Sequence, residues 1–109
     1  MKKFLVLYRM DMAAMKKMME NTSKEEREAG MAEWGTWMKA HTADLADMGG
    51  PVGKNSSVSP SGAKDMSNDL GGYSVIQAES KEAALELLKD NPHLKMPGAT
   101  MDVMEVVAM

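Results

Sequence analysis

The clearest guide to the architecture is Gly71–Met109, which reads GGYSVIQAES (71–80), KEAALELLKD (81–90), NPHLKMPG (91–98) and ATMDVMEVVAM (99–109). The first and last segments alternate in the way strands do, whereas the second places alanines and leucines three and four apart, as a helix does. Ser80 is a favourable N-cap for that helix, and Asn91-Pro92 is expected to end it. The stretch therefore predicts a strand, a helix, a turn and a strand.

The first half of the chain repeats this order. Phe4–Tyr8 is apolar at every position, as expected of a strand that is covered on both faces. Asp11–Glu20 follows as a short methionine-rich helix or a loop. Two overlapping capping boxes in Thr22–Glu26 then begin a longer helix. We expect this helix to run to about Asp47 and to end at Gly49-Gly50-Pro51, with one apolar stripe made of Met31, Trp34, Trp37, Met38, His41, Leu45 and Met48.

The middle and the end of the chain supply the remaining strands. Val52–Ser59 reads as a weak edge strand that leads into a turn at Pro60–Gly62. Lys64–Asp69 reads as a polar loop. Tyr73–Glu79 is the third strand, and Thr100–Ala108 is the last.

These elements predict one α+β domain, residues 1–109, with a ferredoxin-like βαββαβ order and a four-stranded antiparallel sheet. Right-handed crossovers place both helices on one face of the sheet and the first and third strands at its centre. The other face is then bare, although Phe4–Tyr8 is apolar on both sides. A second copy of the chain is the simplest cover, so we expect a homodimer through the open sheet face.

Composition excludes several classes of protein. The chain has 109 residues, a net charge of −3, two histidines and no cysteine. It lacks the basic character of a nucleic-acid-binding protein and any apolar run long enough to span a membrane. The absence of cysteine excludes disulfides and thiolate metal sites and fits a cytoplasmic location. We expect no metal site and no cofactor.

Methionine is unusually abundant, with 14 residues against one phenylalanine. Five of them crowd one segment: Met10, Met12, Met15, Met18 and Met19. Thioethers are ligands for Cu(I), but methionine is also a pliable filler of apolar space. We interpret the methionines as filler and leave the role of residues 10–19 open.

The chain resembles the YCII-related (YciI-like) family, whose members are mostly bacterial. The resemblance rests on the order and spacing of five segments: MKKFLVLYR (1–9), MAEWGTWMKA (31–40), VSPSGAKD (58–65), GGYSVIQAESKEAALELLKDNPHL (71–94) and VMEVVAM (103–109). It implies a ferredoxin-like domain that pairs into a dimeric α+β barrel. It also implies possible enzyme activity, because some members carry a histidine–aspartate pair near the first helix.

Two family motifs are not matched in this sequence. The position that corresponds to the family's early histidine falls near Glu33–Trp34, where there is no histidine. Lys64–Ser67 stands where a sister branch has Asp-Gly-Pro-Phe. The family's proposed catalytic pair is therefore not transferred by position.

Two residues on the long helix form the catalytic hypothesis. His41 belongs to the apolar stripe, where it could act as a general base, and Asp44 lies one helical turn later, where it could orient the imidazole. The alternative is a core histidine that is hydrogen-bonded to the main chain or to a tyrosine.

Six further residues are candidates for ligand binding: Trp34, Trp37, Tyr8, Tyr73, His93 and Glu105. The tryptophans and tyrosines could line a pocket and donate hydrogen bonds, or they could simply pack the core. His93 could present an imidazole from a fixed turn or cap a helix end. Glu105 could act as an acid or base, pair with a charge across a subunit interface, or lie at a solvated edge.

Two functions remain open from sequence alone. The first is binding or transformation of a small molecule in a cleft between the long helix and the sheet. The second is a non-catalytic dimeric module that acts through its surface or as an accessory to another protein. Enzyme activity, substrate and reaction type are left undetermined.

Overall fold

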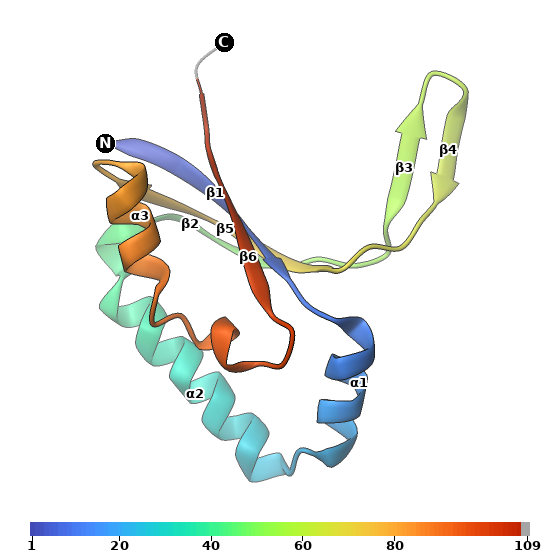
Figure 1. The fold of residues 1–109 in the computed structure, drawn as a ribbon, viewed down its shortest axis with the longest axis horizontal. Helices are drawn as coiled ribbons and strands as arrows, with labels where there is room; N and C mark the ends of the chain where they lie inside the picture. Colours follow the sequence, from blue (N-terminus) through green and yellow to red (C-terminus); the bar gives the residue numbers. More distant parts are fainter. Residues whose placement is uncertain (108–109) are drawn as a thin grey trace.

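The computed structural model describes residues 1–107 of the chain (Figure 1). Its strands and helices, in chain order, are β1 (Lys2–Arg9), α1 (Met12–Asn21), α2 (Lys24–Ala40), β2 (Leu45–Pro51), β3 (Ser56–Ser59), β4 (Gly62–Asp65), β5 (Leu70–Ala78), α3 (Lys81–Leu88) and β6 (Thr100–Glu105). Short 3-10 turns occupy Thr42–Asp44 and Pro92–Lys95. None of the helices in this part of the chain is long and apolar enough to cross a membrane.

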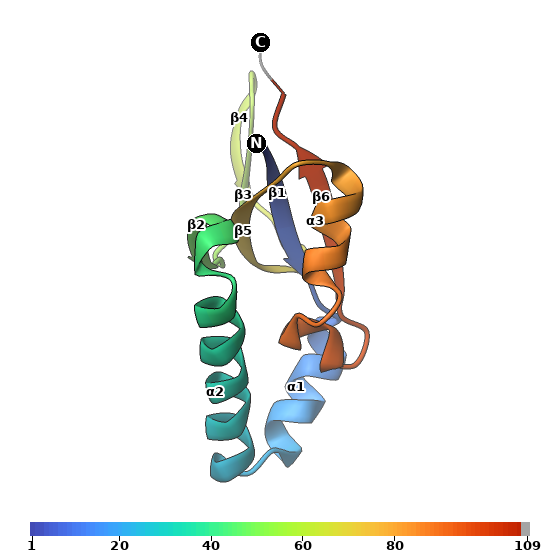
Figure 2. The same cartoon turned by 90° about the vertical axis from the view of Figure 1, so that its left-hand side faces the viewer.

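The main sheet has four antiparallel strands in the order β2-β5-β1-β6. The first strand of the chain and β5 are central, as the sequence predicts, and α2 and α3 lie on the same side of the sheet (Figures 1 and 2). This α+β architecture with a four-stranded antiparallel sheet confirms the expected fold class.

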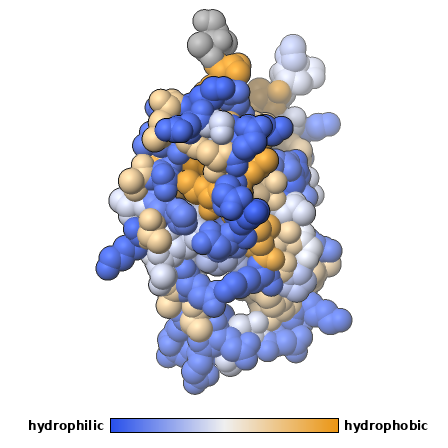
Figure 3. Space-filling view, turned by 60° about the vertical axis from the view of Figure 1, so that its left-hand side comes forward, coloured by the Kyte–Doolittle hydropathy of each residue, from blue (hydrophilic) through white to orange (hydrophobic). Residues whose placement is uncertain are grey.

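The alternation of strand residues divides the sheet into two faces. Phe4, Val6, Ile76 and Ala78 point toward the helices and pack with Trp37, Ala84 and Leu88 in the core. The partner residues Leu5↔Val75 and Leu7↔Tyr73 share the other face, where they are only partly buried. Burying apolar side chains on both faces of β1 therefore needs more than α2 and α3. Figure 3 shows the helix-bearing side, where hydrophilic surface surrounds smaller apolar areas.

The long helix ends earlier than expected. It stops at Ala40, not near Asp47, and Leu45–Pro51 forms β2. The Thr42 hydroxyl donates hydrogen bonds to the carbonyls of Met38 and Lys39, and so satisfies main-chain groups that a longer helix would otherwise use. The edge strand expected at Val52–Ser59 was therefore placed too late in the sequence.

Residues 56–65 form a separate two-stranded hairpin, β3–β4, which pairs Ser59 with Gly62 across the expected turn. Lys64 and Asp65 belong to β4, so the loop predicted over Lys64–Asp69 is wrong at its start. Almost every side chain of the two strands is exposed. The hairpin and α1 lie on the opposite side of the molecule from α3 (Figure 1).

The ends of the chain agree with the sequence analysis in type. Residues 12–21 are helical, and the Asp11 side chain accepts hydrogen bonds from the amides of Ala13 and Ala14. This short helix buries none of its residues. The last strand ends at Glu105, three residues before the predicted end at Ala108, which lies outside the described residues.

Candidate functional site

A cavity of about 670 Å³ lies between α2 and the helix-facing side of the sheet. Strand β2 borders it through Gly49, Gly50 and Pro51, and β5 through Gly71 and Gly72. Glycines keep side-chain volume out of this border. Most of the remaining wall is sulfur and aromatic carbon, from Met10, Met31, Met38, Met48, Met96, Tyr8, Trp34 and Trp37. The cavity is therefore mainly apolar.

Two buried hydroxyls form one polar point in this wall. Tyr8 Oη lies 2.8 Å from Ser74 Oγ, and the two residues are 7% and 2% exposed. Burial raises the pKa of the Tyr8 phenol, and the hydrogen bond with Ser74 and the nearby Asn91 amide offset part of this rise. The phenol is thus protonated at neutral pH, and in its pair with Ser74 either hydroxyl can donate the hydrogen bond.

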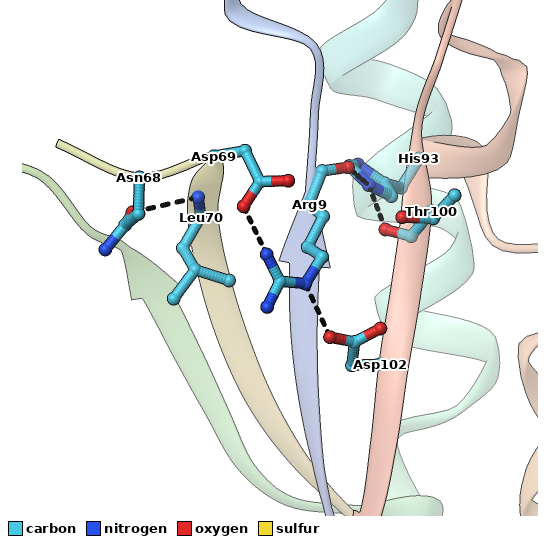
Figure 4. Close-up of polar contacts among 7 residues, drawn as sticks. All are labelled: Arg9, Asn68, Asp69, Leu70, His93, Thr100 and Asp102. Atoms are coloured by element: carbon cyan, nitrogen blue, oxygen red, sulfur yellow. Dashed lines mark hydrogen bonds and ion pairs between the residues drawn. The ribbon is translucent and has the colours of Figure 1, made fainter.

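His93 forms a second polar point. It is 1% exposed, and its Nε2 lies 2.9 Å from the carbonyl oxygens of both Arg9 and Thr100 (Figure 4). The Asn91 side chain accepts a hydrogen bond from the His93 amide at 2.8 Å and so caps the 3-10 turn that carries the imidazole. The imidazole meets the Tyr8 ring edge-on, with centroids 5.1 Å apart.

The Arg9 side chain braces the sheet on the face opposite the cavity. Its guanidinium donates hydrogen bonds to the carboxylates of Asp69, immediately before β5, and Asp102, in β6 (Figure 4). The hydrogen bond and charge of Asp102, followed by Asp69, raise the pKa of Arg9 further above its ordinary value. Arg9 therefore has two roles. Its main-chain carbonyl holds His93, and its side chain links β1 to the neighbouring strands β5 and β6.

The two tryptophans continue the aromatic wall. Tyr8 and Trp34 meet edge-on at 5.6 Å, and Trp34 and Trp37 meet at 6.1 Å. Trp37 is 5% exposed and donates from Nε1 to Asp90 at 3.2 Å. Trp37 packs in the core, and both tryptophans line the cavity.

His41 and Asp44 come together, but outside the cavity. His41 caps the end of α2, with Nδ1 3.3 Å from Asp44 Oδ2 and Nε2 3.8 Å from Asp90 Oδ1. Its ring lies on Trp37 at a centroid distance of 4.7 Å. Neither residue lines the cavity, so the pair of the catalytic hypothesis lies apart from it.

Glu105 and Tyr73 contribute less to the cavity than Tyr8, Trp34, Trp37 and His93 do. Glu105 is exposed, lies 3.6 Å from Lys2 Nζ and does not line the cavity, which agrees with the solvated-edge alternative. Tyr73 borders the cavity, but its register opposite Leu7 assigns its side chain to the open face. His93 is not a helix-end cap, because its imidazole bonds to carbonyls of two strands.

Sequence reasoning did not select Ser74, Asn91 or the lining methionines as part of a site. Ser74 had a visible signal, because it is a polar residue that alternates with Ile76 and Ala78 on the buried side of β5. The methionines gave none, because their spacing does not say which of them meet. Within residues 1–107, no group of three or more histidine, aspartate, glutamate or cysteine side chains is arranged to hold a metal ion.

A smaller groove of about 440 Å³ runs along α1. It is lined by Met10, Met12, Met15, Lys16, Met19 and Glu20. Met10 belongs to both hollows, so the methionine-rich segment adjoins the main cavity.

Known proteins resemble this chain in structure but not in sequence. No known protein family and no curated protein matches the sequence. One similar solved structure is 5-chloro-2-hydroxyhydroquinone dehydrochlorinase (TftG) from Burkholderia phenoliruptrix AC1100, in complex with 2,5-dihydroxybenzoquinone. The match has a TM-score of 0.53 and 14% sequence identity, and it covers 92% of this chain and 90% of the other. It shows that the two proteins share an α+β fold, and the YCII-related assignment stays a prediction.

Proposed function

We propose that the cavity binds or transforms a small, flat and largely apolar molecule with a hydrogen-bonding group at one end. The observation that carries this proposal is the cavity itself: about 670 Å³, walled by methionine and aromatic side chains, with Tyr8–Ser74 and His93 as buried polar points. This volume lies within the range of roughly 300–1,000 Å³ that is typical of small-molecule sites.

The lack of charged side chains in the cavity wall narrows the class of ligand further. Among the described residues that line the cavity there is no lysine, arginine, aspartate or glutamate. A charged ligand would lose its hydration on entering the cavity and would find no opposite charge there, which is costly in free energy. Polarizable thioethers and edge-on aromatic rings favour an uncharged aromatic ring instead.

The similar structure supports the same class of ligand by analogy. TftG acts on a chlorinated hydroxyhydroquinone, and its complex holds a dihydroxybenzoquinone, which is a flat ring with oxygen substituents. Likeness of fold does not transfer a reaction, so the analogy bears on the kind of molecule alone. We treat residues 1–109 as a single YCII-related domain, without a cofactor and, given its lack of cysteine, in the cytoplasm.

A homodimer through the open sheet face is part of this proposal. Leu5, Leu7 and Val75 lie only partly buried on the face that α2 and α3 leave uncovered. A second sheet packed there would complete a dimeric α+β barrel and bury these side chains.

The second candidate is a non-catalytic dimeric module. It is favoured by the hairpin β3–β4, whose exposed strands extend from the body as a surface for contact (Figure 1). It also fits the position of His41 and Asp44 outside the cavity.

Calorimetric titration with naphthalene separates the two candidates. A replacement that fills the cavity, Met38→Trp, is expected to abolish binding while thermal unfolding stays close to that of the parent. Leu85→Trp adds similar bulk at an exposed position of α3, away from both the cavity and the open sheet face, and serves as the matched control. Absence of naphthalene binding to the parent, or equal binding to Met38→Trp, would favour the module.

A further inference from the structure

The imidazole of His93 is fixed at one nitrogen by two strands. Nε2 lies 2.9 Å from the carbonyl of Arg9 at the end of β1 and 2.9 Å from the carbonyl of Thr100 at the start of β6 (Figure 4). A carbonyl oxygen only accepts hydrogen bonds, so Nε2 must carry the hydrogen. A flipped ring would lose both contacts. In the neutral ring, the second nitrogen, Nδ1, is therefore left with a lone pair.

The surroundings of Nδ1 show where this lone pair points. Of the described side-chain nitrogen and oxygen atoms that are fully sealed from solvent, Asn91 Nδ2 is the one without a hydrogen-bond partner. Nδ1 of His93 has no described partner either, because both hydrogen bonds of the ring use Nε2. Since Nδ1 has no partner and yet is not one of the sealed atoms without a partner, it must border open space. His93 is 1% exposed and lines the cavity, so that space is the cavity.

Asn91 plays a different part. Its Nδ2 is sealed and cannot reach a ligand, and its Oδ1 is occupied by the His93 amide. Asn91 is a positioning residue that holds the turn, and His93 is the residue that presents an acceptor to the cavity. In the neighbouring pair of Tyr8 and Ser74, one hydroxyl already donates its hydrogen to the other.

From this geometry we propose that His93 determines ligand specificity by accepting, at Nδ1, a hydrogen bond from a hydroxyl on the buried end of the ligand. The ligand class is then a neutral aromatic or enolic molecule that carries a free hydroxyl. A methyl ether of the same ring has no hydrogen to donate and leaves the lone pair of His93 Nδ1 without a partner. An ionised hydroxyl places a negative charge against the same lone pair. This inference rests on the proposed function, because it assumes that the cavity takes a ligand.

Two probes that differ by one methyl group test the inference. At pH 7.5, 2-naphthol is expected to bind at least about tenfold more tightly than 2-methoxynaphthalene, because an unpaired buried acceptor is costly. In His93→Phe the two affinities should become equal. Equal affinities in the parent would overturn the proposal.

His93→Phe removes two buried hydrogen bonds and can fail to fold, so a measurement on the parent protein is also needed. Nitrogen-15 NMR of labelled histidine should show the hydrogen on Nε2 in the free protein. It should also show a shift of the Nδ1 resonance with 2-naphthol and none with 2-methoxynaphthalene. His41 is the internal control, since it lies outside the cavity and its resonances should stay in place. A hydrogen on Nδ1, or no shift with bound 2-naphthol, would overturn the role of His93 alone, whereas failure of naphthalene itself to bind would overturn the proposed function.

Discussion

Gly49 lies directly against the main-chain oxygen of Tyr73. A Cβ at Gly49 would fall 1.8 Å from that oxygen and 2.6 Å from its carbonyl carbon, and the residue has a positive φ of 67°. Its position coincides with a register shift in the pairing of β2 with β5, between Asp47 and Gly50. Glycine at this point lets the edge strand bend toward its neighbour and form one border of the cavity.

Replacement of Gly49 by alanine is expected to lower the free energy of unfolding by about 2–4 kcal/mol, because the methyl group overlaps the main chain and φ is unfavourable for L-residues. Gly50→Ala is the matched control, since no atom lies within 4 Å of its Cβ. Its effect should stay within about 0.5 kcal/mol. Urea unfolding of the two variants measures the difference, and equal stabilities would show that the close approach is absent in solution.

The buried phenol of Tyr8 makes stability depend on alkaline pH. Burial raises its folded pKa, whereas the unfolded chain has the ordinary value of about 10. Between these values the unfolded chain binds fewer protons, so this contribution is fully present below pH 10 and is lost as the pH rises through the folded pKa. Tyr8→Phe should therefore flatten the fall in unfolding free energy above pH 10.

The control for this prediction keeps the phenol and removes its partner. Ser74→Ala leaves the ring buried and removes the hydrogen bond that lowers the pKa, so the alkaline fall should persist. Near neutral pH, each replacement should cost about 1–2 kcal/mol from the lost buried hydrogen bond. Urea titrations from pH 7 to pH 11 make the comparison, and a parallel fall in parent and Tyr8→Phe would contradict the assignment.

The second half of the fold could be predicted in detail, and the first half only in outline. In Leu70–Glu105, the alternation, the Ser80 cap and Asn91-Pro92 all act locally, so sequence and structure agree. At the end of α2, the apolar spacing continues through Leu45 and Met48, although these residues lie on a strand. A spacing of three to four residues predicts which side chains face the same way, but it does not show whether the backbone is helical. Here Leu45 and Met48 face the same cavity as the apolar residues of α2, although the chain has passed from helix to strand.

The candidate site was only partly predictable because its parts meet across long sequence separations. Tyr8 meets Ser74 across 66 positions, and His93 meets Arg9 across 84. The sequence offered His93 as a residue of a fixed turn, but the carbonyls that hold it have no sequence signature. His41 and Asp44, by contrast, are neighbours on one turn, and their contact follows from spacing alone.

The open face of the sheet leads to a prediction about assembly. Leu7→Glu places a charge among partly buried apolar residues of that face and should convert a dimer into a monomer at micromolar concentration. Leu85→Glu introduces the same charge at an exposed position of α3 and should leave the dimer intact. Analytical ultracentrifugation distinguishes the two. A parent protein that sediments as a single copy would rule out the dimeric barrel.

Methionines at the edge of the cavity lead to a prediction about oxidation. Met31 on α2 and Met48 on β2 both line the cavity, and they are 74% and 64% exposed. Dilute peroxide should convert these two to the sulfoxide before the half-buried Met38, as resolved by peptide mass spectrometry. A polar sulfoxide in an apolar wall should weaken naphthalene binding by about 0.5–1.5 kcal/mol, roughly two- to tenfold.

Two double variants assign this loss to its sites. Met31→Leu with Met48→Leu keeps the apolar wall and removes the exposed thioethers, so its binding should resist peroxide. Met12→Leu with Met19→Leu removes two exposed thioethers from the groove along α1 and should give no protection. Methionine sulfoxide reductase should restore binding to the oxidised parent. If both double variants lose binding as the parent does, the sensitive sulfur lies deeper in the wall, and Met31 and Met48 are not the residues through which oxidants reach the ligand.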